Sequence, residues 1–139
     1  MKKTTLLVSA LCLGFAGVSE VHAGEKIFEC EYTSYSRSGW VPQKAFYRID
    51  EATGAAYAID PYIHKLHDGW IPVNAKLVKA GKYRLKYQLI GLKSSNAGSS
   101  KLNYTVNLDM NRMQATYRAL LSGADNNISA KAACKPYTD

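Results

Sequence analysis

Hydrophobic and polar residues alternate with a period of two along much of the chain, the pattern of half-buried β-strands. The clearest strand covers residues 82–89, with alternating side chains on two faces: Tyr83, Leu85, Tyr87 and Leu89 against Lys82, Arg84, Lys86 and Gln88. The same alternation predicts strands around residues 28–32, 44–50, 55–59, 102–108, 113–121 and 127–134. No sustained helical stripe interrupts them, so the sequence predicts an all-β protein.

Short polar segments separate these predicted strands. The segment 50–54 ends in Gly54, which can adopt the positive φ that a hairpin turn needs. In the turn at residues 109–112, Asn111 is the expected left-handed residue. Strands joined by such turns predict a single antiparallel up-and-down sheet of seven or eight strands. The sheet would form a barrel, which the pattern slightly favours, or a two-sheet sandwich.

The first residues have the features of an export signal. Lys2 and Lys3 precede an apolar run over residues 6–18, and a small-residue cleavage site ends at Ala23. Cleavage there divides the chain into a signal peptide, residues 1–23, and a single β-domain, residues 24–139. The apolar run is shorter than the roughly 20 residues of a transmembrane helix. We therefore expect no transmembrane segment and a periplasmic or secreted location.

Cys30 and Cys134 remain after the signal, which contains Cys12, is removed. Exported proteins favour disulfides, and both cysteines occupy inward positions of the predicted first and last strands. A metal site would need further ligands close in sequence, and a redox role usually brings a Cys-x-x-Cys motif. We predict a structural disulfide that joins the first strand to the last.

Basic residues outnumber acidic ones, and this balance points to anionic partners. Without Lys2, Lys3 and Glu20, the chain has 16 basic and 10 acidic residues, a net charge of +6. If their strands are neighbours, the outward basic residues form a candidate binding face: Lys82, Arg84, Lys86, Arg112 and Arg118. Ordinary polar-outward alternation is the competing interpretation. No nucleic-acid recognition motif occurs, so nucleic acid is not an expected partner.

Two irregular segments, residues 34–42 and 60–70, are predicted to be loops, which often carry function. Their candidate contact residues are Tyr35, Arg37, Trp40, Tyr62, His64, His67 and Trp70. The two histidines, with Asp60 and Asp68, resemble a metal ligand set. Zinc, however, normally takes three or four ligands on a rigid frame, so we predict no metal and no cofactor.

Patterns that would indicate an enzyme are missing from the sequence. The serines lack a nucleophile elbow, most acids fall in turns, and no glycine-rich phosphate loop is present. We therefore predict a noncatalytic binding domain that engages an anionic envelope component or a protein partner. The inward tyrosines would fill the core or line a cavity, so a lipocalin-like carrier of a small apolar ligand is the alternative. A hydrolase that uses His64 or His67 is a third hypothesis.

Three short strings suggest a resemblance: residues 48–56 (RIDEATGAA), residues 28–30 (FEC), and residues 125–130 (DNNISA) leading to Cys134. In layout the chain resembles small exported bacterial all-β proteins of unassigned function with a terminal cysteine pair. That resemblance implies an exported β-domain and transfers no active site. A fainter similarity is to periplasmic inhibitors of c-type lysozyme, but this chain is basic and has no counterpart of their inhibitory loop motifs.

Overall fold

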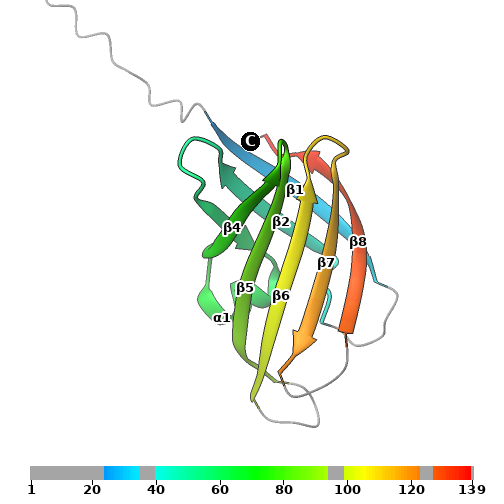
Figure 1. The fold of residues 1–139 in the computed structure, drawn as a ribbon. Coiled ribbons are helices and arrows are strands. Elements are labelled where there is room, and N and C mark those ends of the chain that lie inside the picture. Colours follow the sequence, from blue (N-terminus) through cyan, green and yellow to red (C-terminus); the bar gives the residue numbers. More distant parts are fainter. Residues whose placement is uncertain (1–23, 35–39, 94–98, 123–126, 139) are drawn as a thin grey trace, which may run out of the picture.

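The computed structural model describes residues 24–34, 40–93, 99–122 and 127–138 (Figure 1). Their elements, in chain order, are β1 (Glu25–Ser34), β2 (Lys44–Asp50), β3 (Ala56–Ile59), α1 (Pro61–His67), β4 (Ile71–Lys79), β5 (Lys82–Lys93), β6 (Ser99–Asp109), β7 (Gln114–Leu121) and β8 (Asn127–Pro136). The strands form one closed antiparallel barrel in sequence order. The barrel prediction is therefore confirmed over the sandwich. The predicted signal peptide lies outside the described residues.

The barrel closes by pairing of β1 with β8. Cys30 lies opposite Cys134 in this register, and the two form a disulfide across 104 residues of sequence. This confirms the predicted link between the first and last strands. Cys30 is fully buried, and Cys134 packs against the core from a half-buried position.

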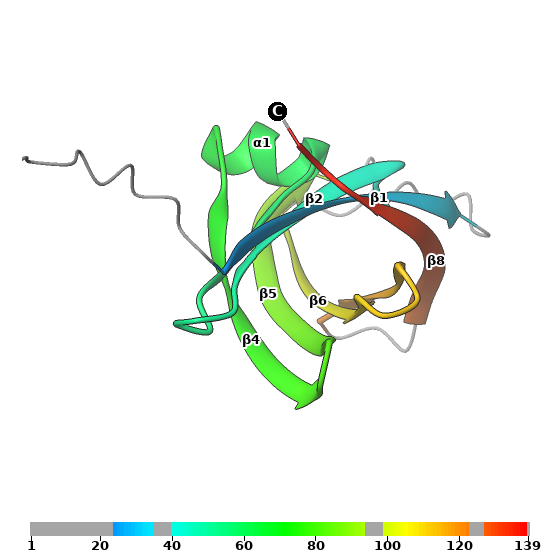
Figure 2. The ribbon, with the colours of Figure 1, turned by 90° about the horizontal axis from the view of Figure 1, so that it is seen from above.

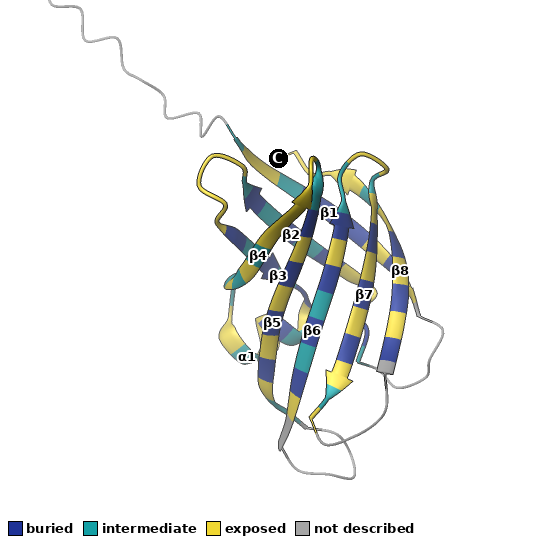
Figure 3. Ribbon diagram, in the orientation of Figure 1, coloured by how far each residue is buried: buried dark blue, intermediate teal, exposed yellow. Residues whose placement is uncertain are grey.

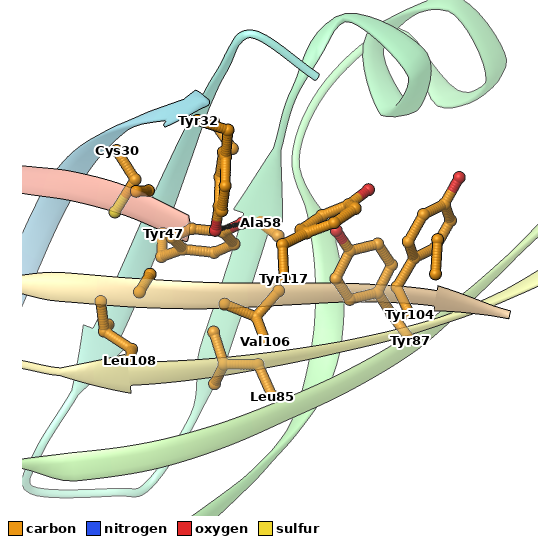
Figure 4. Close-up of a cluster of buried hydrophobic side chains, with 14 of the residues drawn as sticks. Cys30, Tyr32, Tyr47, Ala58, Leu85, Tyr87, Tyr104, Val106, Leu108 and Tyr117 are labelled. Atoms are coloured by element: carbon orange, nitrogen blue, oxygen red, sulfur yellow. Dashed lines mark hydrogen bonds between the residues drawn. The ribbon is translucent and has the colours of Figure 1, made fainter. Parts of the chain in front are cut away.

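Alternation along the strands fills the interior, as the banded ribbon of Figure 3 shows. The odd positions over residues 83–89 of β5 and 115–119 of β7, and the even positions over residues 102–108 of β6, point inward and are buried. Tyr47, Tyr104 and Tyr117 are the largest fully buried side chains. Their rings pack with those of Tyr32 and Tyr87 (Figure 4), and the Tyr104 centroid lies 5.1 Å from that of Tyr87. Aromatic rings therefore occupy the barrel's centre.

Most of the segment at residues 60–70 is the helix α1, Pro61–His67, and not the predicted loop. Asp60 caps α1 because its Oδ1 accepts the N–H groups of Tyr62 and Ile63, both at 2.8 Å. Pro61 occupies the first turn, where its missing N–H removes no helical bond. Only Ile63 is buried. A two-turn helix with one buried residue has no hydrophobic period long enough to read in the sequence.

The turn between β6 and β7 also differs from its prediction. Met113, not Asn111, has the positive φ, 52°. The Asp109 Oδ1 accepts the N–H groups of Asn111 and Arg112, and the Asn111 side chain donates to the carbonyl of Ala80. Asn111 is thus fixed by one bond within its own turn and one to the β4–β5 turn, and the left-handed residue, Met113, comes just before β7.

At one end the barrel splits between β3 and β4. The short β3 pairs with β4 only at Ile71, Pro72 and Val73, while β4 continues to Lys79. Seen from above, the β4–β5 hairpin curves away from β1 and β2 (Figure 2). Residues 74–79 consequently have β5 as a neighbour on one side and no described strand on the other.

Candidate functional site

The predicted basic residues do not lie on neighbouring strands, because β6 lies between β5 and β7 (Figure 1). They nevertheless share one outer face. Lys86 of β5 is opposite Thr105 of β6, which is opposite Arg118 of β7. Two strand spacings separate the two cations, about 10 Å. Arg112 was expected on a strand and instead lies in the β6–β7 turn, because β7 begins only at Gln114.

We define the basic face as the outward cations of β5, β6 and β7: Lys82, Arg84, Lys86, Lys101 and Arg118. These three strands contain a single carboxylate, Asp109, whose Oδ2 lies 3.6 Å from Lys82 Nζ. Partial burial acts to raise the pKa of Asp109. The N–H groups of Arg112 and Asn111 and the charge of Lys82 outweigh it, so that pKa is lowered. The face therefore carries a strong excess of positive charge.

Neutral polar side chains hold part of this face in place. Arg84 Nε donates to Asn107 Oδ1 at 3.1 Å, and Asn107 Nδ2 donates to Thr116 Oγ1 at 3.4 Å. Around them lies a shallow depression of about 260 Å³, which Lys82 and Gln114 also line. A guanidinium fixed by a hydrogen bond loses less side-chain entropy when it binds an anion.

Exposed apolar side chains lie on the same face, toward the end that α1 covers. Ile90 is 63% exposed and Leu120 is 42% exposed. Ile90 is opposite Lys101, and Leu120 is opposite Asn103 of the same strand. Apolar and cationic groups thus share one end of the basic face, a combination that suits a membrane surface.

The outer surface of β1 and β2 is different, because its charges are paired. Lys44 Nζ lies 2.6 Å from Glu29 and 3.4 Å from Glu31. The hydrogen bond from Lys44 lowers the pKa of Glu29, against the effect of its burial, and raises that of Lys44. Further ion pairs on this surface are Lys26–Glu51, Arg48–Glu25 and Lys135–Glu29. The positive charge of the molecule is therefore concentrated on the other side.

A polar cluster lies inside the barrel beneath α1 (Figure 4). The hydroxyls of Tyr32 and Tyr47 are hydrogen-bonded at 2.8 Å. Among the described atoms, the hydroxyls of Tyr87, Tyr104 and Tyr117 and the Asp60 Oδ2 are buried without a hydrogen-bond partner. Burial raises the pKa of Asp60 to about 6, although two backbone N–H groups act to lower it. Because the rings pack against one another here, side chains fill this part of the interior.

The predicted loop contacts have separate roles. Tyr35 and Arg37 lie outside the described residues. Trp40 and Tyr62 pack against the core. The guanidinium of Arg48 lies over the ring of Trp70, with its Cζ 5.1 Å from the ring centroid. His64 and His67 are exposed on α1, not in a loop. Within the described part of the chain, no three histidine, cysteine or acidic residues group as metal ligands.

Comparison of the chain with protein-family models, curated proteins and solved structures finds no match. Of the described helical residues, none form a segment long and apolar enough to cross a membrane. The candidate site therefore depends on the geometry of the basic face alone. Three of its residues were not predicted from the sequence, namely Lys101, Ile90 and Leu120. Ile90 and Lys101 lie one residue beyond the predicted strands 82–89 and 102–108, so extending each strand by one residue would have included them. Leu120 lies inside the predicted strand 113–121, at an outward position that was not singled out because leucine is apolar.

Proposed function

We propose that this protein is a noncatalytic binding domain that attaches to an anionic surface of the cell envelope through its basic face. The observation that carries the proposal is the imbalance of charge on the basic face, whose five cations are accompanied by one carboxylate, Asp109. Since the opposite surface is ion-paired, the molecule has a preferred side for approach to negative charge.

The exposed apolar residues favour a lipid surface over a soluble polyanion. Ile90 and Leu120 project beside Lys101 at one end of the basic face. A phospholipid surface offers phosphate groups to the lysines and an apolar layer to the two side chains. Each lysine near an anionic membrane contributes about 1 kcal/mol, so the basic face supplies reversible attachment.

Binding to vesicles of phosphatidylglycerol tests this proposal. We expect purified protein to sediment with these vesicles at low salt, to be released as salt rises, and to ignore phosphatidylcholine vesicles. The double variant Lys86→Gln/Lys101→Gln should bind about thirtyfold more weakly, since two lysines account for about 2 kcal/mol.

A matched control removes the same charge from the opposite side. Lys26→Gln/Lys135→Gln changes two exposed lysines that are ion-paired on the β1 side of the barrel. This variant should retain vesicle binding within about twofold. Failure of the unaltered protein to bind at low salt, or equal losses in the two double variants, would contradict the proposal.

A further inference from the structure

Within the described part of the chain, the outer half of β4 is a free sheet edge. Over residues 74–79 the strand pairs with β5 on one side, and β3 ends before reaching its other side. Figure 3 shows this part of β4 as largely exposed. An unpaired edge presents backbone N–H and C=O groups that can pair with an extended segment of another chain.

The side chains along this edge alternate in character. Ala75 and Leu77 lie opposite Leu85 and Tyr83, whose side chains point into the barrel. Lys76 lies opposite the outward Arg84. Leu77 is nevertheless 57% exposed, because no neighbouring strand covers it. An added strand would place every second side chain against this exposed apolar surface.

An opening of about 660 Å³ lies just beyond the end of β4. Its lining includes Ala80 of the β4–β5 turn, Met110 and Met113 of the β6–β7 turn, Phe28 of β1, and Tyr137, which follows β8. An added strand that continues past Lys79 would reach this mostly apolar space. Glu25 and Glu51 also line it, but each is already in an ion pair, with Arg48 and Lys26.

Like charges face each other across the β4–β5 hairpin, which indicates the chemistry of the partner. Lys76 is opposite Arg84, and Lys79 is opposite Lys82. Directly opposed like charges destabilise a strand pair. The one carboxylate within ion-pair distance of these four cations is, in the described structure, Asp109 beside Lys82. Acidic side chains on an added strand would lie next to Lys76 and relieve this repulsion.

We propose that the free edge at residues 74–79 of β4 binds an extended segment of a partner protein that alternates apolar and acidic residues. Its apolar side chains cover Ala75 and Leu77, and its acidic side chains lie beside Lys76. A second copy of this chain is a poorer occupant, because edge-to-edge pairing would bring Lys76 and Lys79 close to the same lysines of its neighbour.

Fluorescence polarisation with synthetic peptides as long as the free edge tests this site. A labelled peptide that alternates valine and glutamate should bind at least about tenfold more tightly than one that alternates valine and lysine. Two N-methylated forms, one modified at every valine nitrogen and the other at every glutamate nitrogen, should differ in affinity. Only one set of N–H groups can face β4 in a given orientation.

Protein variants locate the site. Leu77→Asp should abolish peptide binding, and Lys76→Glu should weaken it. The control Leu120→Asp changes an exposed leucine on β7, a strand paired on both sides, and should leave peptide binding unchanged. The Lys86→Gln/Lys101→Gln protein should still bind the peptide although its vesicle binding is reduced, so the two proposals fail separately.

The proposal is overturned if no peptide binds the unaltered protein, if the glutamate and lysine peptides bind equally, or if both N-methylated forms bind like the parent. Light scattering on the unaltered protein gives one more result. A dimer at micromolar concentration that Leu77→Asp dissociates would assign the edge to a second copy and reject the partner segment. A monomer that binds the acidic peptide supports the proposal.

Discussion

Replacing Asp60 by Asn should stabilise the protein near neutral pH. The Asp60 carboxylate is 4% exposed, and only its Oδ1 has hydrogen-bond donors, the N–H groups of Tyr62 and Ile63. The amide oxygen of the substituted side chain can accept the same two bonds, so the cap on α1 is kept. What disappears is a carboxylate charge in a poorly solvated position.

The sign of the effect follows from the pKa. Burial raises the pKa of Asp60 from 3.8 to about 6, so the folded protein holds this proton more tightly than the unfolded chain does. The stabilising effect of the proton is complete below about pH 4 and is lost as the pH rises through about 6. A shift of about two units corresponds to about 3 kcal/mol, the largest loss expected for the parent protein at pH 7.

Urea unfolding with the disulfide intact measures this effect at several pH values between 4 and 7.5. The free energy of unfolding of Asp60→Asn, minus that of the parent, should rise by up to about 3 kcal/mol across this range. Other carboxylates titrate in both proteins and cancel in the difference. As a control, Asp60→Ala removes the charge and the cap, which lowers its stability by about 1 kcal/mol relative to Asp60→Asn at every pH. A difference between Asp60→Asn and the parent that stays constant with pH would refute the reasoning.

Two further predictions concern the frame of the barrel. Replacing Cys30 and Cys134 by Ser should lower the free energy of unfolding by about 4.7 kcal/mol, because the unfolded chain gains the entropy of an open loop. The fraction of the protein that still folds should bind vesicles as before. Loss of vesicle binding with an unchanged free energy of unfolding would contradict a structural role for the disulfide. Gly81→Ala should destabilise the protein more than Gly54→Ala, as urea unfolding will show. Both glycines have φ of +75°, but a Cβ at Gly81 would lie 2.5 Å from Asn111 Oδ1, whereas at Gly54 it meets nothing within 4 Å.

Much of the barrel could be predicted because its strands are solvated on one face. Alternation located β2 at residues 44–50 and placed Tyr83, Leu85 and Tyr87 inside. Helix α1 was not predicted, because its formation depends on the cap at Asp60 and on one buried side chain, Ile63. Neither feature produces a helical repeat of hydrophobic residues in the sequence. Closure of the barrel was likewise not fixed by local pattern, since it depends on the register of β1 with β8.

The candidate site was harder to predict than the fold. Outward basic residues were recognisable, but their partners across the strands were not. The contrast between the ion-paired Lys44 and the like-charged pair of Lys76 and Arg84 comes from strand register. The split between β3 and β4 comes from a difference in strand length, and no strand was predicted at residues 71–79.

The pairing of β1 with β8 also brings the two ends of the barrel chain together, where the Tyr137 N–H donates to the Ile27 carbonyl at 2.8 Å. A short linker between these ends, with a new opening in the exposed hairpin at residues 51–55, would give a circularly permuted barrel. In that chain Cys30 and Cys134 would enclose a loop of about 15 residues, for which a disulfide contributes about 3 kcal/mol. The same disulfide would then close a short loop instead of linking distant parts of the sequence. The strands would be synthesised in a different order, while the barrel stayed the same.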